Sequence, residues 1–150
     1  MNEPTPETPR PIGLADLDDF TRAYLRCALW ASTDNDYHGE GDPRNLPDGK
    51  SNGGSPLDDN YDLEDIAPAC LAQAKADCEG FRDYCRKTGV DIDSVDGEQA
   101  GHDFFLTRNG HGTGFWDRGL GKLGDDLSKA SKTFGSVDFY IGADGKVYSQ

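Results

Sequence analysis

Apolar side chains recur every three or four residues over three stretches of the chain, the spacing of a helix that packs one face on a core. The first stretch spans 14–31, and the second spans 63–87 with a start just after Pro68 as the alternative. A shorter stretch with the same spacing covers 120–134 and ends at Gly135, a residue type that often terminates helices. The sequence therefore predicts two longer helices and one short helix.

The remaining apolar residues follow a two-residue period that is typical of strands. Residues 137–141 alternate in this way, a turn follows at 143–145, and 146–148 returns. Residues 102–107 are rich in aromatic side chains, which favour strands. They precede Asn109-Gly110, the strongest short signal for a hairpin turn. We therefore expect a second hairpin across 101–119.

The order of these elements predicts an α+β fold, with two longer helices and one short helix packed on a small antiparallel sheet of three to four strands. A single domain is expected over 13–150, because its length suffices for one hydrophobic core. Residues 1–12 are proline-rich and polar, and are interpreted as a flexible tail. Residues 32–61 lack periodicity and are rich in Asp, Asn and Gly, which predicts a long acidic loop.

The net charge of −13 is distributed unevenly along the chain. Residues 1–100 hold 22 of the 28 acidic residues and 9 of the 15 basic ones, whereas 101–150 hold six of each. A strongly acidic surface repels nucleic acid and anionic membranes, and it attracts proteins that normally bind nucleic acid. We expect the acidic part to bind such a partner, and the later part to act mainly as scaffold. The candidate partner-binding residues are Asp16, Asp18, Asp19, Asp34, Asp36, Asp58, Asp59, Asp62, Glu64 and Asp65.

A second hypothesis places chemistry on the expected 101–119 hairpin. Histidines paired with carboxylates can exchange protons or bind a metal ion, and cross-strand pairing would bring such residues together. The residues of this alternative site are His102, Asp103, His111 and Asp117. The alternative is a small metal-dependent or acid–base enzyme. The opposing interpretation is that histidines beside glycines are ordinary turn residues.

No cofactor or metal ion is expected from the remaining motifs. Asp34, Asp36, Glu40 and Asp42 resemble the start of a calcium-binding loop, but Asn45 stands where the closing glutamate belongs. Residues 49–51, Gly-Lys-Ser, match the end of a phosphate-binding loop but lack its first glycine. We interpret this region as a solvated acidic loop.

The four cysteines are predicted to be reduced, because the chain shows no secretory signal and would remain in a reducing compartment. Cys70, Cys78 and Cys85 lie turns apart along one side of the second helix, so they cannot pair with one another. We expect Cys78 and Cys85 to be buried. Trp116 is expected to be buried as well, packing with Phe104 or Phe115.

The stretch GHDFFLTRNGHGTGFWDRG, followed by a helix and then VDFYIGADGKVYS, resembles the C-terminal part of small acidic proteins found in bacteriophage genomes. The segment PLDDNYDLEDIAPACLAQAKADCEGF is similar to the part that precedes it in those proteins. The resemblance covers roughly 55–150. That family has no assigned activity, so no catalytic residues carry over. It implies a phage or mobile-element origin and a place of action inside a bacterial cell.

Together, charge and resemblance predict a phage-encoded acidic binding protein rather than an enzyme. It would inhibit a host protein that has a basic nucleic-acid-binding surface, in defence evasion or host takeover, and DNA mimicry is one way to do so. No direct contact with nucleic acid is expected, because a strongly acidic surface repels it. No membrane span is expected either, since no run approaches ~18 apolar residues. The expected location is the bacterial cytoplasm. The sequence leaves the target and the oligomeric state open.

Overall fold

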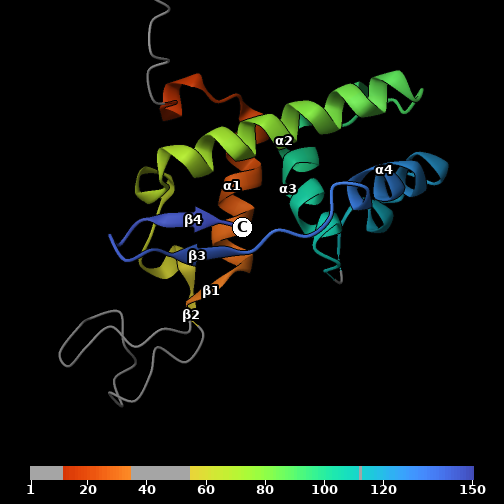
Figure 1. Cartoon of the computed structure of the whole chain (residues 1–150). Coiled ribbons are helices and arrows are strands. Elements are labelled where there is room, and N and C mark those ends of the chain that lie inside the picture. The colour runs from red at the N-terminus through yellow and green to blue at the C-terminus, as the bar shows by residue number, and fades with distance from the viewer. Residues whose placement is uncertain (1–11, 35–54, 112) are drawn as a thin grey trace, which may run out of the picture.

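The computed structural model describes residues 12–34, 55–111 and 113–150. Four helices form the body of these parts (Figure 1): α1 (Asp19–Ala31), α2 (Pro68–Lys87), α3 (Gly97–Arg108) and α4 (Lys122–Lys132). Short 3-10 turns lie before α1 and between the helices. Their bounds are Leu14–Asp16, Leu57–Asp59, Leu63–Asp65, Ile92–Ser94 and Phe115–Asp117.

The described strands form two separate antiparallel pairs. β1 (Thr33–Asp34) pairs with β2 (Ser55–Pro56), and β3 (Phe139–Ile141) pairs with β4 (Val147–Ser149). The mixed α+β class is therefore confirmed, but the single sheet of three to four strands is not found in the described residues. The predicted strand over 102–107, which would have enlarged the sheet, belongs to a helix.

Helix starts are set by local chemistry that the periodicity does not reveal. The side chain of Asp18 accepts a hydrogen bond from the Thr21 amide at 2.9 Å, so it caps α1 and the helix begins at Asp19 rather than at Leu14. α2 begins at Pro68, the alternative start, because proline is well suited to the first turn of a helix. The first helix is thus shorter than predicted, and the second matches the alternative.

The expected hairpin over 101–119 is wrong, because residues 97–108 form α3. Asp96 caps this helix by accepting a hydrogen bond from the Gln99 amide at 3.0 Å. Asn109-Gly110 ends the helix instead of turning a hairpin. The Asn109 side chain donates to the Phe105 carbonyl at 2.9 Å, and Gly110 adopts a φ of +71°.

Burial on nearly every side explains why the pattern of α3 misleads. Between Ala100 and Arg108 every residue is buried except His102, so apolar side chains do not form a single stripe. α1 lies against α3 so closely that a Cβ atom on Gly101 would stand 2.0 Å from the Phe20 carbonyl oxygen. Only glycine allows that approach.

Stacked aromatic rings join α2 to α3 in the core. The rings of Phe81 and Phe104 lie 4.1 Å apart at an angle of 9°, and the Phe115 ring also stacks on Phe81, at 5.8 Å. Phe134 meets both Phe81 and Phe104 edge-on. These rings are the centre of one hydrophobic core that all four helices share.

Arg108, at the end of α3, connects the helices through a buried cation. Its guanidinium donates to the Tyr24 hydroxyl of α1 at 2.9 Å and to the Asp77 carboxylate of α2 at 2.8 Å. It also donates to the carbonyls of Phe134 and Gly135, just after α4, at 3.0 and 2.8 Å. One side chain therefore ties together all four helices.

We predict that Arg108→Lys lowers the free energy of unfolding by about 3 kcal/mol, since an ammonium group cannot reproduce the guanidinium fork and leaves buried acceptors unpaired. Urea denaturation measures the change. Arg86→Lys is the matched control, because Arg86 forms its ion pairs on the surface and should change stability little. If the two substitutions lowered stability equally, the buried structural role of Arg108 would be contradicted.

All four cysteines are free and buried, which confirms the predicted burial of Cys78 and Cys85. Burial raises the pKa of Cys27 to about 12 and that of Cys85 to about 11, and it also raises the pKa values of Cys70 and Cys78. The thiols therefore stay protonated and unreactive in the folded protein at neutral pH.

The raised thiol pKa values predict that stability falls as pH increases above about 9, the ordinary pKa of these groups. The unfolded chain loses thiol protons from that point, whereas the folded chain holds them until about pH 11–12, so unfolding becomes more favourable. Denaturation between pH 8 and pH 11 measures the slope. Cys27→Ala should flatten it, and an unchanged slope would argue against this cause.

Candidate functional site

Five carboxylates lie close together on the two 3-10 turns between β2 and α2. We call these residues, Asp58, Asp59, Asp62, Glu64 and Asp65, the acidic segment. Asp62 accepts a hydrogen bond from the Glu64 amide at 2.9 Å, and Asp65 accepts one from the Asp62 amide at 2.9 Å. These two side chains therefore shape the turn.

The other three side chains of the acidic segment point into solvent. Asp58, Asp59 and Glu64 are exposed, and the structure gives them no side-chain hydrogen bond or ion pair within its described residues. Residues 51–74 contain these five acidic residues and no lysine or arginine. The acidic segment is thus a concentration of negative charge without a basic neighbour in the chain.

Many carboxylates elsewhere in the described residues are paired with a cation. These ion pairs are Asp18–Arg82, Glu79–Lys75, Asp83–Arg86, Asp93–Arg86, Asp77–Arg108, Asp103–Arg118 and Asp126–Lys122. Partial burial of Asp18 opposes its ionisation, but hydrogen bonds from Thr21 and Arg82 outweigh this and lower its pKa. The contrast distinguishes the acidic segment from acidic residues that stabilise the fold.

The remaining predicted partner-binding residues lie in different settings. Asp16, Asp18 and Asp19 lie before and at the start of α1, and only Asp18 and Asp19 are well exposed. Asp34 lies on β1 with 3% of its surface exposed, so its prediction as a surface contact is wrong. β1 pairs with β2 there, and this pairing draws the residue inward. Asp36 falls outside the described residues.

The four residues of the alternative enzyme site are not gathered in one place. His102 faces a pocket with Arg26 and Arg118, whereas His111 faces a different pocket at the other end of α3. Asp117 is exposed on a 3-10 turn. Among the residues that the structure describes, no group of three or more His, Cys, Asp or Glu side chains is placed to hold a metal ion. The helical conformation of 97–108 separates what a hairpin would have joined.

Asp103 is fully buried and acts as a clamp between α3 and the following turn. Its carboxylate accepts hydrogen bonds from Arg118 at 2.8 Å and from the Gln99 amide group at 3.0 Å. The hydrogen bond to Asp103 also raises the pKa of Arg118 above its ordinary value. His102 Nδ1 lies 3.8 Å from the same carboxylate, too far for a hydrogen bond.

The expected burial of Trp116 is also wrong, since 54% of its surface is exposed. Its neighbour Phe115 fills the core instead. The Phe115 amide donates to the Thr107 hydroxyl at 3.2 Å, and Gly114 approaches that hydroxyl so closely that an added Cβ would lie 2.2 Å from it. These contacts fix which of the two aromatic residues points inward.

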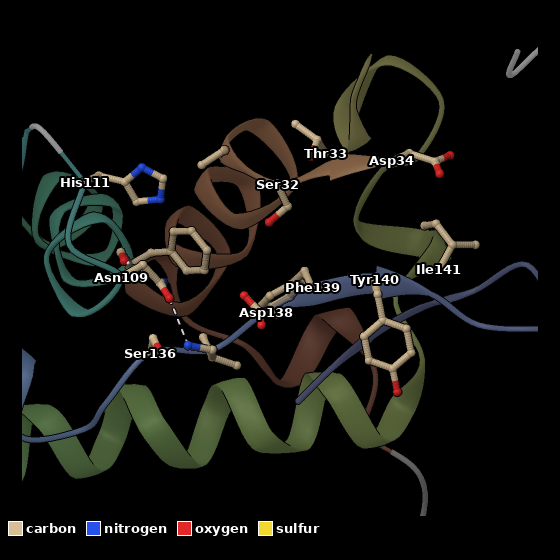
Figure 2. Close-up of a pocket in the computed structure, with 13 residues that line it drawn as sticks. Ser32, Thr33, Asp34, Asn109, His111, Ser136, Asp138, Phe139, Tyr140 and Ile141 are labelled. Carbon is tan, nitrogen blue, oxygen red and sulfur yellow. Dashed lines mark hydrogen bonds between the residues drawn. The ribbon is translucent and has the colours of Figure 1, made fainter. Parts of the chain in front are cut away.

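A pocket of about 620 Å³ opens where α1 and α3 end (Figure 2). Residues 31–34, Phe105, Asn109, His111 and 136–141 line it. Asn109 holds the far wall in place, because its side-chain oxygen accepts a hydrogen bond from the Val137 amide at 2.8 Å. Sequence reasoning selected His111 and Asp34 but missed the pocket, since its walls come from three distant stretches of the chain.

Comparison with protein-family models, curated proteins and solved structures finds no match for this chain. No helix in the described ranges has the length and apolar character needed to cross a membrane.

We predict that Asp103→Asn lowers the free energy of unfolding by about 2 kcal/mol, because a buried charge-assisted contact with Arg118 is lost. Thermal denaturation measures it. Asp117→Asn, on the exposed neighbour of Arg118, should leave stability unchanged. A stable Asp103→Asn protein that nevertheless lost an activity would favour the enzyme hypothesis.

Proposed function

We propose that this protein is an acidic binding protein that occupies the basic nucleic-acid-binding surface of a partner and thereby inhibits it. The observation that carries the proposal is the acidic segment, where exposed carboxylates lie with no basic residue between 51 and 74. Arginines of a partner can form charge-assisted hydrogen bonds to such carboxylates. Within the described parts of the chain, no lysine or arginine pairs with Asp58, Asp59 or Glu64.

The overall charge of −13 supports the same function. Long-range attraction between oppositely charged surfaces accelerates association and disfavours partners of like charge. Exposed Asp19 adds negative charge at the start of α1, where Asp18 is paired with Arg82. A host protein in the bacterial cytoplasm and a phage origin remain part of this proposal, on the strength of the resemblance over 55–150.

The enzyme alternative receives less support from the arrangement of its residues. Asp103 is engaged by Arg118 and Gln99, while His102 and His111 face different pockets. A proton-transfer pair would need a histidine and a carboxylate within hydrogen-bond distance. The binding hypothesis needs only exposed charge.

We predict that Asp58→Lys, Asp59→Lys and Glu64→Lys together preserve folding and weaken partner binding by roughly tenfold or more. These three residues were chosen because Asp62 and Asp65 hold the turn. Partner proteins captured from bacterial lysate would be identified, purified and tested for release of duplex DNA by the wild-type protein. The protein's competition with DNA for the partner should weaken at higher salt, since screening reduces the strength and range of charge interactions.

The matched control reverses Asp91, Glu98 and Asp125, which are exposed residues outside the acidic segment. Both triple variants change the net charge by the same amount, so total charge alone would weaken binding equally. Equal loss in the two variants, or a captured partner that keeps its DNA, would overturn the proposed function.

A further inference from the structure

The pocket at the ends of α1 and α3 has an electronegative lining. Among the described residues that line it are two carboxylates, Asp34 and Asp138, and no lysine or arginine. Asp138 is exposed, and its side chain makes no hydrogen bond or ion pair in the described part of the chain. The Asp138 carboxylate is therefore available to a positively charged group that enters the pocket.

Helix geometry adds to this negative potential. α1 and α3 run side by side in the same direction, and both end at the pocket (Figure 1). The carbonyl end of a helix carries a partial negative charge that favours cations within about one turn. α1 has no basic residue in its last turn, and Arg108 of α3 directs its guanidinium into the core.

The pocket also offers one exposed imidazole ring and hydroxyl acceptors. Phe105 and Phe139 meet edge-on at 5.7 Å and are almost fully buried, whereas the exposed His111 ring lies 6.2 Å from Phe105. Ser32 and Ser136 lie on opposite sides of the pocket, with Asp138 between Ser136 and Phe139 (Figure 2). A planar cation can stack on aromatic rings while its edge donates to such oxygens.

We propose that this pocket binds the guanidinium of an arginine side chain, supplied by the basic partner. Arginine fits better than lysine because its five donors match the several oxygens and its flat face matches the exposed His111 ring. The volume of about 620 Å³ also admits the residues on either side of the arginine. The partner's role as donor rests on the proposed function.

The pocket lies next to the acidic segment, so one partner can contact both at the same time. The Leu57 amide, at the start of the turn that carries Asp58 and Asp59, donates to the Ser32 carbonyl at 2.9 Å. Ser32 is itself a pocket residue. A partner attracted by the acidic segment therefore has the pocket within reach of a neighbouring arginine.

The test uses N-acetyl-arginine methylamide as the probe and the neutral citrulline analogue as its matched ligand. Titration followed by two-dimensional NMR should shift resonances of Ser32, Asn109, His111 and Asp138 with the arginine probe. Asp138→Asn should weaken this binding roughly tenfold, equivalent to about 1.4 kcal/mol. Asp125→Asn, far from the pocket lining, should leave it unchanged.

Equal binding of citrulline, tighter binding of the lysine analogue, or shifts confined to the acidic segment would each overturn the pocket assignment. A folded Asp138→Asn variant that binds the probe normally would do so as well, with folding checked by thermal denaturation. The triple lysine variant of the acidic segment separates the two proposals. This variant should still bind the arginine probe. If it also still binds the partner, the proposed function is contradicted but the pocket assignment is not.

Discussion

The buried guanidinium of Arg108 is the interaction on which the arrangement of the helices depends. A cation removed from water is costly unless it finds hydrogen-bond acceptors, and Arg108 makes four hydrogen bonds, to Tyr24, Asp77 and two carbonyls after α4. These acceptors belong to α1, to α2 and to the segment after α4, so the contact specifies how the helices sit relative to one another. Hydrophobic burial alone would tolerate several arrangements, because it is not directional.

Acidic residues in this molecule fall into two groups. Those in ion pairs stabilise the fold, and those without an ion pair contribute to the charge of the surface. Carboxylates such as Asp77 and Asp103 are held by arginines and stabilise the fold. The acidic segment lies on short turns, where Asp58, Asp59 and Glu64 are exposed and pair with no cation among the described residues. The proposed partner surface and arginine pocket lie next to each other because Ser32 and Leu57 join their backbones.

The most unusual stretch of the chain, 100–119, acts largely as structure. Gly101 permits close helix packing, Asp103 clamps Arg118, and Asn109 holds Val137 in the pocket wall. Glycines and polar residues at such positions look like a functional signature, yet close contact and buried hydrogen bonding also require them. Of the histidines considered for catalysis, His111 borders the pocket to which we assign binding.

The sequence by itself determined the mixed class, three of the four helices, the β3–β4 hairpin and the charge of 1–100, because periodicity and composition are local properties. Local sequence does not decide everything, because periodicity placed the start of α1 too early. The dipeptide Asn109-Gly110 is a second case, since the same two residues can form a hairpin turn or end a helix. Tertiary structure decided that 97–108 is helical, since burial on nearly every side removes the periodic signal. It also decided the burial of Asp34, the exposure of Trp116 and the pocket, because each depends on contacts between residues far apart in the chain.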